Sequence, residues 1–281
     1  MWSKLSKSFM ERKNKPKVII LRTAGTNCDQ ETYHAFKNCG AQVDLVHINR
    51  LLKKEIHLND YHILAIPGGF TYGDDIESGR ILANELRFHL ADDLRRFIDS
   101  GKLVIGICNG FQVLVKAGIL PGSLENQGDR DFNQTATLTN NDSGKFEDRW
   151  IHLKVSGKSA WTKDLEKNVV YFPVAHAEGK FVPRDKMVLE QLNRNRQIVF
   201  RYCSKEGGRS SYPGNPNGSV EDIAGIVDKT GRVLGLMPHP ERHFCATQHP
   251  SWTRLSKFGA YGDGAKIFQN GVNYVKENLL S

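Results

Sequence analysis

One stretch of the sequence decides the fold: Lys102-Leu-Val-Ile-Gly106-Ile-Cys108-Asn-Gly110-Phe-Gln112-Val-Leu114. Residues 103–107 are apolar without interruption, which is typical of a short strand that is buried on both faces of a parallel sheet. Cys108 follows between two glycines, and helix-compatible residues come directly after it. The pattern therefore predicts a tight turn from a strand into a helix, with Cys108 at the carboxyl end of the strand.

The turn allows two roles for Cys108. Gly-x-Cys-x-Gly has the spacing of a nucleophile elbow, with Cys in place of Ser. A sulfur at the N-terminus of a helix is favoured as thiolate by the helix dipole. A cysteine in the same place could also pack as a small buried hydrophobe. The motif alone does not decide between the two.

Strands and helices alternate through the first 120 residues. The apolar runs predict strands at 18–21, 43–46, 63–66 and 103–107, and helices at 29–38 and 79–100. This alternation predicts an α/β fold with a mostly parallel sheet flanked by helices. Ligands of such sheets bind beyond the carboxyl ends of the strands. The loops after Leu21 and Ile66 should therefore meet the Cys108 turn at one crevice.

The C-terminal half has a different pattern. Short β-branched runs separated by turn-rich pieces predict additional, partly antiparallel strands. These runs are 135–139, 150–155, 169–172, 188–192, 198–202, 223–227 and 233–237, and an amphipathic helix at 263–279 closes the chain.

Composition limits the class of protein. The chain has 281 residues, of which 39% are hydrophobic and 25% charged, as in soluble globular proteins. Its apolar runs are far shorter than the ~20 residues of a membrane span, and the start lacks the apolar core of a secretory signal. Five cysteines without regular spacing argue against a disulfide framework. We therefore expect a cytoplasmic protein.

The net charge of +8 is concentrated at one end. Six basic residues crowd the first seventeen positions, and the remainder is only mildly basic. We interpret residues 1–16 as a basic, flexible extension and residues 17–281 as one catalytic domain. A solvated tail is favoured over a nucleic-acid-binding arm, because no aromatic residues are interleaved with basic ones. No nucleic acid or membrane partner is expected.

A thiolate nucleophile needs a base, and the base needs an orienting group. Both types occur in Pro238-His239-Pro240-Glu241, directly after the predicted strand 233–237. Pro240 biases His239 toward extended backbone, in which side chains at i and i+2 point the same way. His239 and Glu241 can therefore lie side by side at a strand end. The alternative is a capped turn with a surface His and Glu.

Other chemistries receive weaker support. Side chains of metal-donor types occur close together in the sequence at His239, Glu241, His243, Cys245 and His249. Pro238 and Pro240 prevent a continuous helix, on which these side chains would converge on one ion. Gly259-x-x-x-x-Gly264-Ala-Lys266 misplaces the P-loop lysine by one and follows no strand. We expect neither a metal nor a cofactor in this chain. The glycine-rich loop 68–75 could bind phosphate or form an oxyanion hole beside Cys108. Cys28 is the second-ranked thiol.

The motifs together resemble a known family. Gly-Ile-Cys108-Asn-Gly-Phe-Gln112 with Pro-His239-Pro-Glu241 is similar to class I (triad) glutamine amidotransferases, which have a flavodoxin-like fold. Four further motifs resemble the glutaminase subunits of phosphoribosylformylglycinamidine synthase: Gly25-Thr-Asn-Cys-Asp29, Gly68-Gly-Phe-Thr-Tyr-Gly-Asp74, Ala175-His-Ala-Glu-Gly179 and Asn215-Pro-Asn-Gly-Ser219. The tail and residues 244–262 look like additions to the family pattern.

The resemblance implies a mechanism. Cys108 would attack the side-chain amide of L-glutamine to form a thioester, His239 would carry the proton to the leaving ammonia, and Glu241 would orient His239. Backbone N–H groups at Gly69, Phe70 and Asn109 would hold the oxyanion, and water would release glutamate. Residues Gln112 and His176 would contact the substrate.

The same resemblance implies a partner. A synthetase subunit that binds ATP and Mg²⁺ would use the ammonia to convert formylglycinamide ribonucleotide to formylglycinamidine ribonucleotide in purine biosynthesis. Thus the hydrolase chemistry would belong to this chain, and the nucleotide-dependent ligase chemistry to the complex. The need for a third small subunit stays open. Two alternatives also stay open: another cysteine hydrolase of this fold, and a non-catalytic binding module.

Overall fold

The computed structural model describes residues 15–122, 132–165, 169–255 and 259–281. Within these residues the central sheet has nine strands, in the order β2-β1-β3-β4-β11-β10-β9-β6-β7. The first five are parallel to one another. They are β2 (Gln42–His47), β1 (Lys17–Arg22), β3 (Ile63–Ile66), β4 (Leu103–Ile107) and β11 (Val233–Leu236).

The other half of the sheet is antiparallel. Each of its strands pairs antiparallel with the next: β10 (Ile223–Val227), β9 (Ile198–Cys203), β6 (Glu147–Val155) and β7 (Val169–His176). A separate two-stranded sheet joins β5 (Ala136–Thr139) to β8 (Lys180–Pro183). The predicted α/β class, with antiparallel strands added in the C-terminal half, is confirmed.

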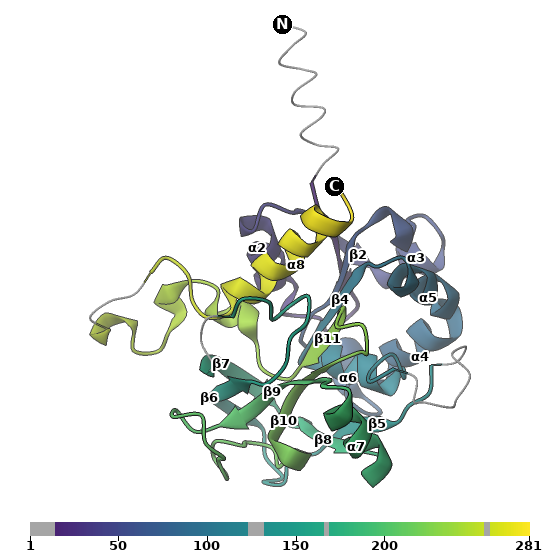
Figure 1. Ribbon diagram of the computed structural model, residues 1–281. Helices are drawn as coiled ribbons and strands as arrows, with labels where there is room; N and C mark the ends of the chain where they lie inside the picture. The colour runs from purple at the N-terminus through teal and green to yellow at the C-terminus, as the bar shows by residue number, and fades with distance from the viewer. Residues whose placement is uncertain (1–14, 123–131, 166–168, 256–258) are drawn as a thin grey trace, which may run out of the picture.

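Helices cover both faces of the parallel strands (Figure 1). On one face, α2 (Asp29–Asn38), the first helix of the described residues, packs on α8 (Ala265–Asn278), where the rings of Phe36 and Phe268 meet edge to face at 5.0 Å. The opposite face carries α4 (Arg80–His89), α5 (Ala91–Asp99) and α6 (Asn109–Lys116). Shorter helices are α3 (Ile48–Leu52), η1 (Leu58–Asp60), η2 (Thr71–Asp74), η3 (Val220–Asp222), η4 (Pro240–His243), η5 (Ala246–Gln248) and η6 (Trp252–Arg254). No helix in the described part of the chain is long and apolar enough to cross a membrane.

The prediction of one helix over 79–100 is wrong. The chain breaks at Leu90, which has φ −122° and ψ 9° and is buried. A straight helix of that length would extend ~33 Å, about twice the length of a five-residue strand. The break lets α4 pack against α6 and α5 against η1, so both helices stay on the sheet.

The prediction of a strand at 188–192 is also wrong. These residues lie in α7 (Lys186–Arg194). The carboxylate of Asp185 caps the helix by accepting the N–H of Val188 at 2.9 Å. Val188 and Leu192 are both buried, and their spacing of four residues places them on one helical face. The cap and the helical spacing outweigh the β-branched content of the segment.

The turn between β4 and α6 depends on two glycines. A Cβ atom on Gly110 would lie 1.9 Å from the carbonyl oxygen of Ile66 in β3, and one on Gly106 would lie 2.5 Å from the carbonyl oxygen of Gly110. The start of α6 therefore lies directly against the backbone of the sheet. This contact fixes the position of Cys108, which stands between the two glycines.

We expect Gly110→Ala to destabilise the fold, because the added methyl group would have to displace backbone atoms. Overpacking typically costs about 1–3 kcal/mol of unfolding free energy. Guanidinium denaturation of the variant against wild type measures the loss. Gly208→Ala is the matched control, since its Cβ would meet only the hydroxyl of Ser204 at an ordinary 3.6 Å. Equal stability of the two variants would contradict the close contact.

Candidate active site

Cys108 occupies a strained turn at the carboxyl end of β4. Its φ of 52° and ψ of −107° lie outside the regions that a side chain ordinarily allows. Its own N–H donates to the carbonyl of Leu236 in β11 at 2.8 Å, which anchors the turn to the sheet. The thiol is 5% exposed and stands at the N-terminus of α6. The predicted sharp strand-to-helix turn is therefore present.

His239 and Glu241 form a buried pair where the chain leaves β11. His239 has extended backbone, with φ −102° and ψ 91°, and its N–H donates to the carbonyl of Pro173 at 2.9 Å. Its Nδ1 donates to Oε1 of Glu241 at 2.6 Å. Both side chains are almost fully buried. The predicted side-by-side arrangement is confirmed by this contact.

The surroundings favour a charged His239. Burial alone would lower the pKa of the imidazole, but Glu241 and the thiols of Cys108 and Cys28 together raise the pKa well above its usual value. Among the described residues none makes a fully formed hydrogen bond to Nε2 of His239. With Nδ1 bound to Glu241, Nε2 is the nitrogen left to exchange a proton. The site thus suits an imidazolium–thiolate pair.

The loop after β3 supplies backbone donors. Gly68 lies between the reactive groups: a Cβ there would be 2.8 Å from Cε1 of His239 and 3.4 Å from Cβ of Cys108. The N–H of Phe70 already donates to the carbonyl of Gly25 at 2.9 Å. Of the three predicted oxyanion donors, Phe70 therefore has its N–H engaged elsewhere, and the roles of Gly69 and Asn109 stay predictions. The first N–H of a helix, as at Asn109, has no partner within the helix.

The side chain of Asn109 organises the neighbouring loop. Its Oδ1 accepts the hydroxyl of Thr71 at 2.7 Å, and its Nδ2 donates to Oδ1 of Asp74 at 3.2 Å and to Oε1 of Gln112 at 3.0 Å. Gln112 in turn donates to the backbone carbonyl of Glu178. Both ends of the Gln112 amide are thus bound to protein. Its predicted contact with substrate stays a prediction.

Sequence reasoning missed a buried lysine in this network. Lys116 is on the same helix, and its side chain is 1% exposed. Its Nζ donates to the carbonyl of Ser78 at 2.9 Å and lies 3.4 Å from Glu77 and 3.5 Å from Glu178. The available signal was a lysine that directly follows the apolar run 113–115.

His176 lies at the end of β7, inside the protein. Its Nδ1 donates to Oδ1 of Asn141 at 3.2 Å, and the same oxygen accepts the N–H of Gly179 at 3.0 Å. Its Nε2 is buried without a hydrogen-bond partner among the described residues. Burial, assisted by the charge of His239, lowers the pKa of His176 to about 3. His176 is therefore a neutral acceptor beside the reactive pair, consistent with its predicted role as a substrate contact.

One group of side chains has the spacing of a metal site. Donor atoms of Cys28, His239 and Glu241 lie within 4.8 Å of one another. However, Glu241 is bound at the Nδ1 edge of the imidazole, which faces away from Nε2. A single ion could not take both the carboxylate and Nε2 as close ligands. The expectation of no metal stays a prediction.

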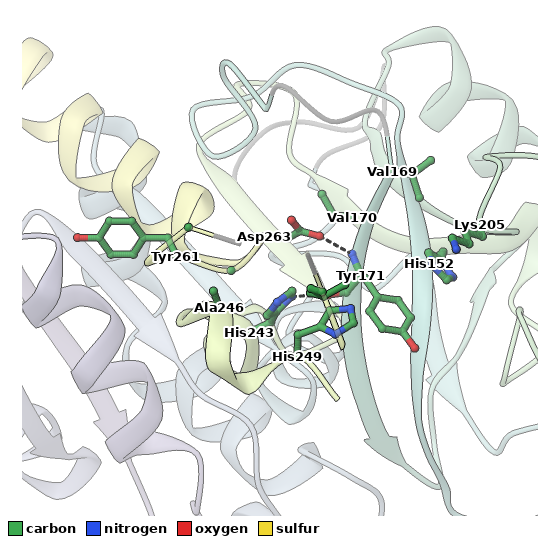
Figure 2. Close-up of a pocket in the computed structure, with 13 residues that line it drawn as sticks. His152, Val169, Val170, Tyr171, Lys205, His243, Ala246, His249, Tyr261 and Asp263 are labelled. Carbon is green, nitrogen blue, oxygen red and sulfur yellow. Dashed lines mark hydrogen bonds between the residues drawn. The ribbon is translucent and has the colours of Figure 1, made fainter. Parts of the chain in front are cut away.

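Two of the other predicted metal donors, His243 and His249, line a cavity of about 630 Å³ that is separate from the Cys108 site (Figure 2). His243 donates to the carbonyl of Tyr171 at 2.8 Å, and Asp263 accepts the N–H of Tyr171 at 3.1 Å. His249 stacks at a tilt on Tyr171. Residues between 244 and 262 thus form one wall of a cavity against β7. The near-P-loop glycine Gly264 instead packs against Pro240, where a Cβ would lie 1.9 Å from the carbonyl oxygen.

Comparisons with known proteins agree with this geometry. Residues 15–275 match the model of the CobB/CobQ-like glutamine amidotransferase domain. The phosphoribosylformylglycinamidine synthase subunit PurQ of Dehalococcoides mccartyi is 47% identical, over 94% of this chain and 99% of its own length. The PurQ subunit of Archaeoglobus fulgidus is 44% identical, over 93% and 97%. The structure of PurLQS from Thermotoga maritima aligns with a TM-score of 0.68 at 30% identity, covering 93% of this chain and 99% of that one.

The low pKa of His176 predicts acid sensitivity. The group is neutral in the folded protein but takes up a proton near its ordinary pKa of ~6.5 when the chain unfolds. Its contribution to stability is therefore fully present above ~6.5 and is lost as the pH falls toward 3, by up to about 1.4 kcal/mol per pH unit.

Urea unfolding at several pH values between about 7 and 4 tests this linkage. His176→Asn should flatten the decline of unfolding free energy with falling pH. His57→Asn, at an exposed histidine, is the control and should keep the wild-type slope. An unchanged slope in His176→Asn would show that the buried imidazole is not the source.

Proposed function

Since the chain belongs to the CobB/CobQ-like glutamine amidotransferase family, we propose that it releases ammonia from L-glutamine through Cys108, His239 and Glu241. It is a glutaminase subunit of the type that serves phosphoribosylformylglycinamidine synthase. The observation that supports the catalytic assignment best is the strained turn of Cys108 beside the buried pair of His239 and Glu241.

Acyl transfer accounts for the arrangement. The Cys108 thiolate attacks the side-chain carbonyl carbon of glutamine, and the N–H groups of Gly69 and Asn109 stabilise the oxyanion that forms. His239 gives its Nε2 proton to the nitrogen, so that ammonia leaves and a thioester remains. A water molecule then attacks the thioester while His239 takes its proton. Glutamate leaves, and the thiolate is restored.

Glu241 keeps the histidine in its working state. Its hydrogen bond to Nδ1 fixes the ring, and its charge stabilises the imidazolium in a buried site. The neutral His176, whose Nε2 has no hydrogen-bond partner among the described residues, would bind a polar group of glutamine, and Gln112 would assist through its remaining N–H. Neither proton transfer by His239 nor binding of glutamine requires a cofactor, and we propose that this chain holds none.

The ammonia has a defined recipient in the proposed reaction. We infer that a synthetase subunit binds ATP and Mg²⁺ and uses the ammonia to convert formylglycinamide ribonucleotide to formylglycinamidine ribonucleotide. The neighbour from T. maritima is a PurLQS structure, which supports a complex with a third component. We propose that a third small subunit also joins this chain. The five unpaired cysteines support a cytoplasmic location.

Cys108→Ala should abolish glutamine hydrolysis in the complex with the synthetase, because no other residue would carry the acyl group. Ammonium added to the same complex should still support synthesis, since it bypasses this chain. Cys203→Ala, at a buried cysteine of β9, serves as the control for loss of a thiol. Glutamate release by Cys108→Ala would reject the nucleophile. Binding of glutamine without hydrolysis by wild type would favour a sensing module.

Glu241→Gln should lower glutamine turnover by about 10²- to 10⁴-fold, the usual contribution of acid–base catalysis. The neutral amide no longer raises the pKa of His239, so the imidazolium that would accompany a Cys108 thiolate is less stable. Mass spectrometry of iodoacetamide labelling at Cys108, measured against pH, reports that change directly. Glu190→Gln, at an exposed carboxylate of α7, is the control. Identical labelling profiles would contradict the role of Glu241.

A further inference from the structure

A second thiol borders the reactive pair, and the mechanism above does not use it. Cys28 lies just before α2 and is 1% exposed. The point where a Cβ of Gly68 would lie is 3.1 Å from Sγ of Cys28, 3.4 Å from Cβ of Cys108 and 2.8 Å from Cε1 of His239. The N–H of Cys28 donates to the carbonyl of Gly68 at 3.2 Å. The two cysteines and the imidazole thus crowd around one glycine, where a side chain would keep them further apart.

The immediate partners of Cys28 are polar. Arg242 donates from Nη2 to Sγ of Cys28 at 3.1 Å and from Nε to Glu31 at 3.2 Å, so its guanidinium is held in place. The thiol itself donates to Oδ1 of Asn27 at 3.2 Å. A cysteine that served only as packing would need neither a cation nor an amide beside its sulfur. A guanidinium in this position stabilises a thiolate as it forms.

The two thiols differ in readiness to react. Burial raises the pKa of Cys28, although His239 and Arg242 oppose this effect. Cys28 therefore stays protonated at rest, while Cys108 has the strained turn and the helix N-terminus. An oxidant that enters the site should react with Cys108 first. Cys28 is then the thiol that borders the same glycine as the oxidised Cys108, so it can reach the product without leaving the site.

We propose that Cys28 is the resolving thiol of a reversible redox switch, which captures oxidised Cys108 as an intramolecular disulfide. The oxidant is a small peroxide. The Cys108 thiolate attacks one peroxide oxygen, the O–O bond breaks, and hydroxide leaves with the sulfenic acid formed. The Cys28 sulfur then attacks the sulfur of Cys108 and expels hydroxide, which takes the Cys28 proton to form water.

The disulfide would have two effects. It removes the nucleophile, so glutamine hydrolysis and ammonia release stop under oxidising conditions. It also prevents further oxidation of Cys108 to sulfinic acid, which is irreversible for most proteins. The proposal depends on Cys108 being the reactive thiol of the proposed function. The cross-link itself, however, can be measured without glutamine or a partner.

The test treats the reduced full-length protein with a small excess of hydrogen peroxide, at least the two equivalents that sulfinic acid formation consumes, and maps its peptides under non-reducing conditions. We expect a peptide pair joined through Cys28 and Cys108. Dithiothreitol should then restore most of the glutaminase activity of the complex. In Cys28→Ser, which keeps the side-chain volume, the pair should be absent and Cys108 should progress to sulfinic acid. Its recovery, relative to its own unoxidised activity, should be several-fold lower than that of wild type.

Cys39→Ala is the matched control, since Cys39 lies at the far end of α2 and should not affect cross-linking or recovery. Equal recovery of wild type and Cys28→Ser, or cross-links that involve other cysteines, would overturn the proposal. A cross-link in a protein that hydrolyses no glutamine would leave the switch supported and reject only the proposed function. Glutamine hydrolysis without a cross-link would do the reverse.

Discussion

The close approach of α6 to the backbone of β3 is the constraint on which the site depends. Gly110 has no room for a side chain against Ile66, so the distance between the start of α6 and the sheet is fixed. The residue before the helix, Cys108, must then adopt a positive φ to connect β4 with α6. The unfavourable backbone is compensated by the parallel strands on both sides, which are continuously buried. Backbone strain at Cys108 is thus maintained by packing elsewhere in the sheet.

The neighbouring strand β11 adds the second constraint. It pairs with β4 in parallel, and Leu236 lies opposite Ile107. The residues that follow these two strands therefore leave the sheet at the same level. His239 therefore arrives beside Cys108 through strand pairing, although the two are far apart in sequence. The glycine loop after β3 completes the same edge. Three consecutive strands of the sheet thus bring Cys108, His239 and Gly68 to one place.

Sequence patterns predicted the parallel half of the sheet, the turn at Cys108 and the contact between His239 and Glu241, because each follows from local rules: continuous apolar runs, glycine spacing and proline geometry. The break at Leu90 and the helix at 186–194 were missed, since both depend on neighbours that a local pattern does not contain. The bond from Phe70 to Gly25 was missed for the same reason. The predicted meeting of the loops after Leu21 and Ile66 at the Cys108 turn is confirmed, since Cys28 and Cys108 both lie against Gly68. Residues 1–14, most of the predicted N-terminal extension, lie outside the described part of the chain.

Lys116 joins parts of the protein that otherwise share no secondary structure. Its charge holds the Ser78 carbonyl and Glu77 on one segment and Glu178 on another, and that second segment also accepts the Gln112 amide. Glu77 is half exposed, whereas the lysine is inside. A protein surface that neutralises or displaces Glu77 changes the electrostatic balance around a buried cation. Glu178 shares that cation, so a change of charge at Glu77 also alters the electrostatic environment of the segment that follows His176.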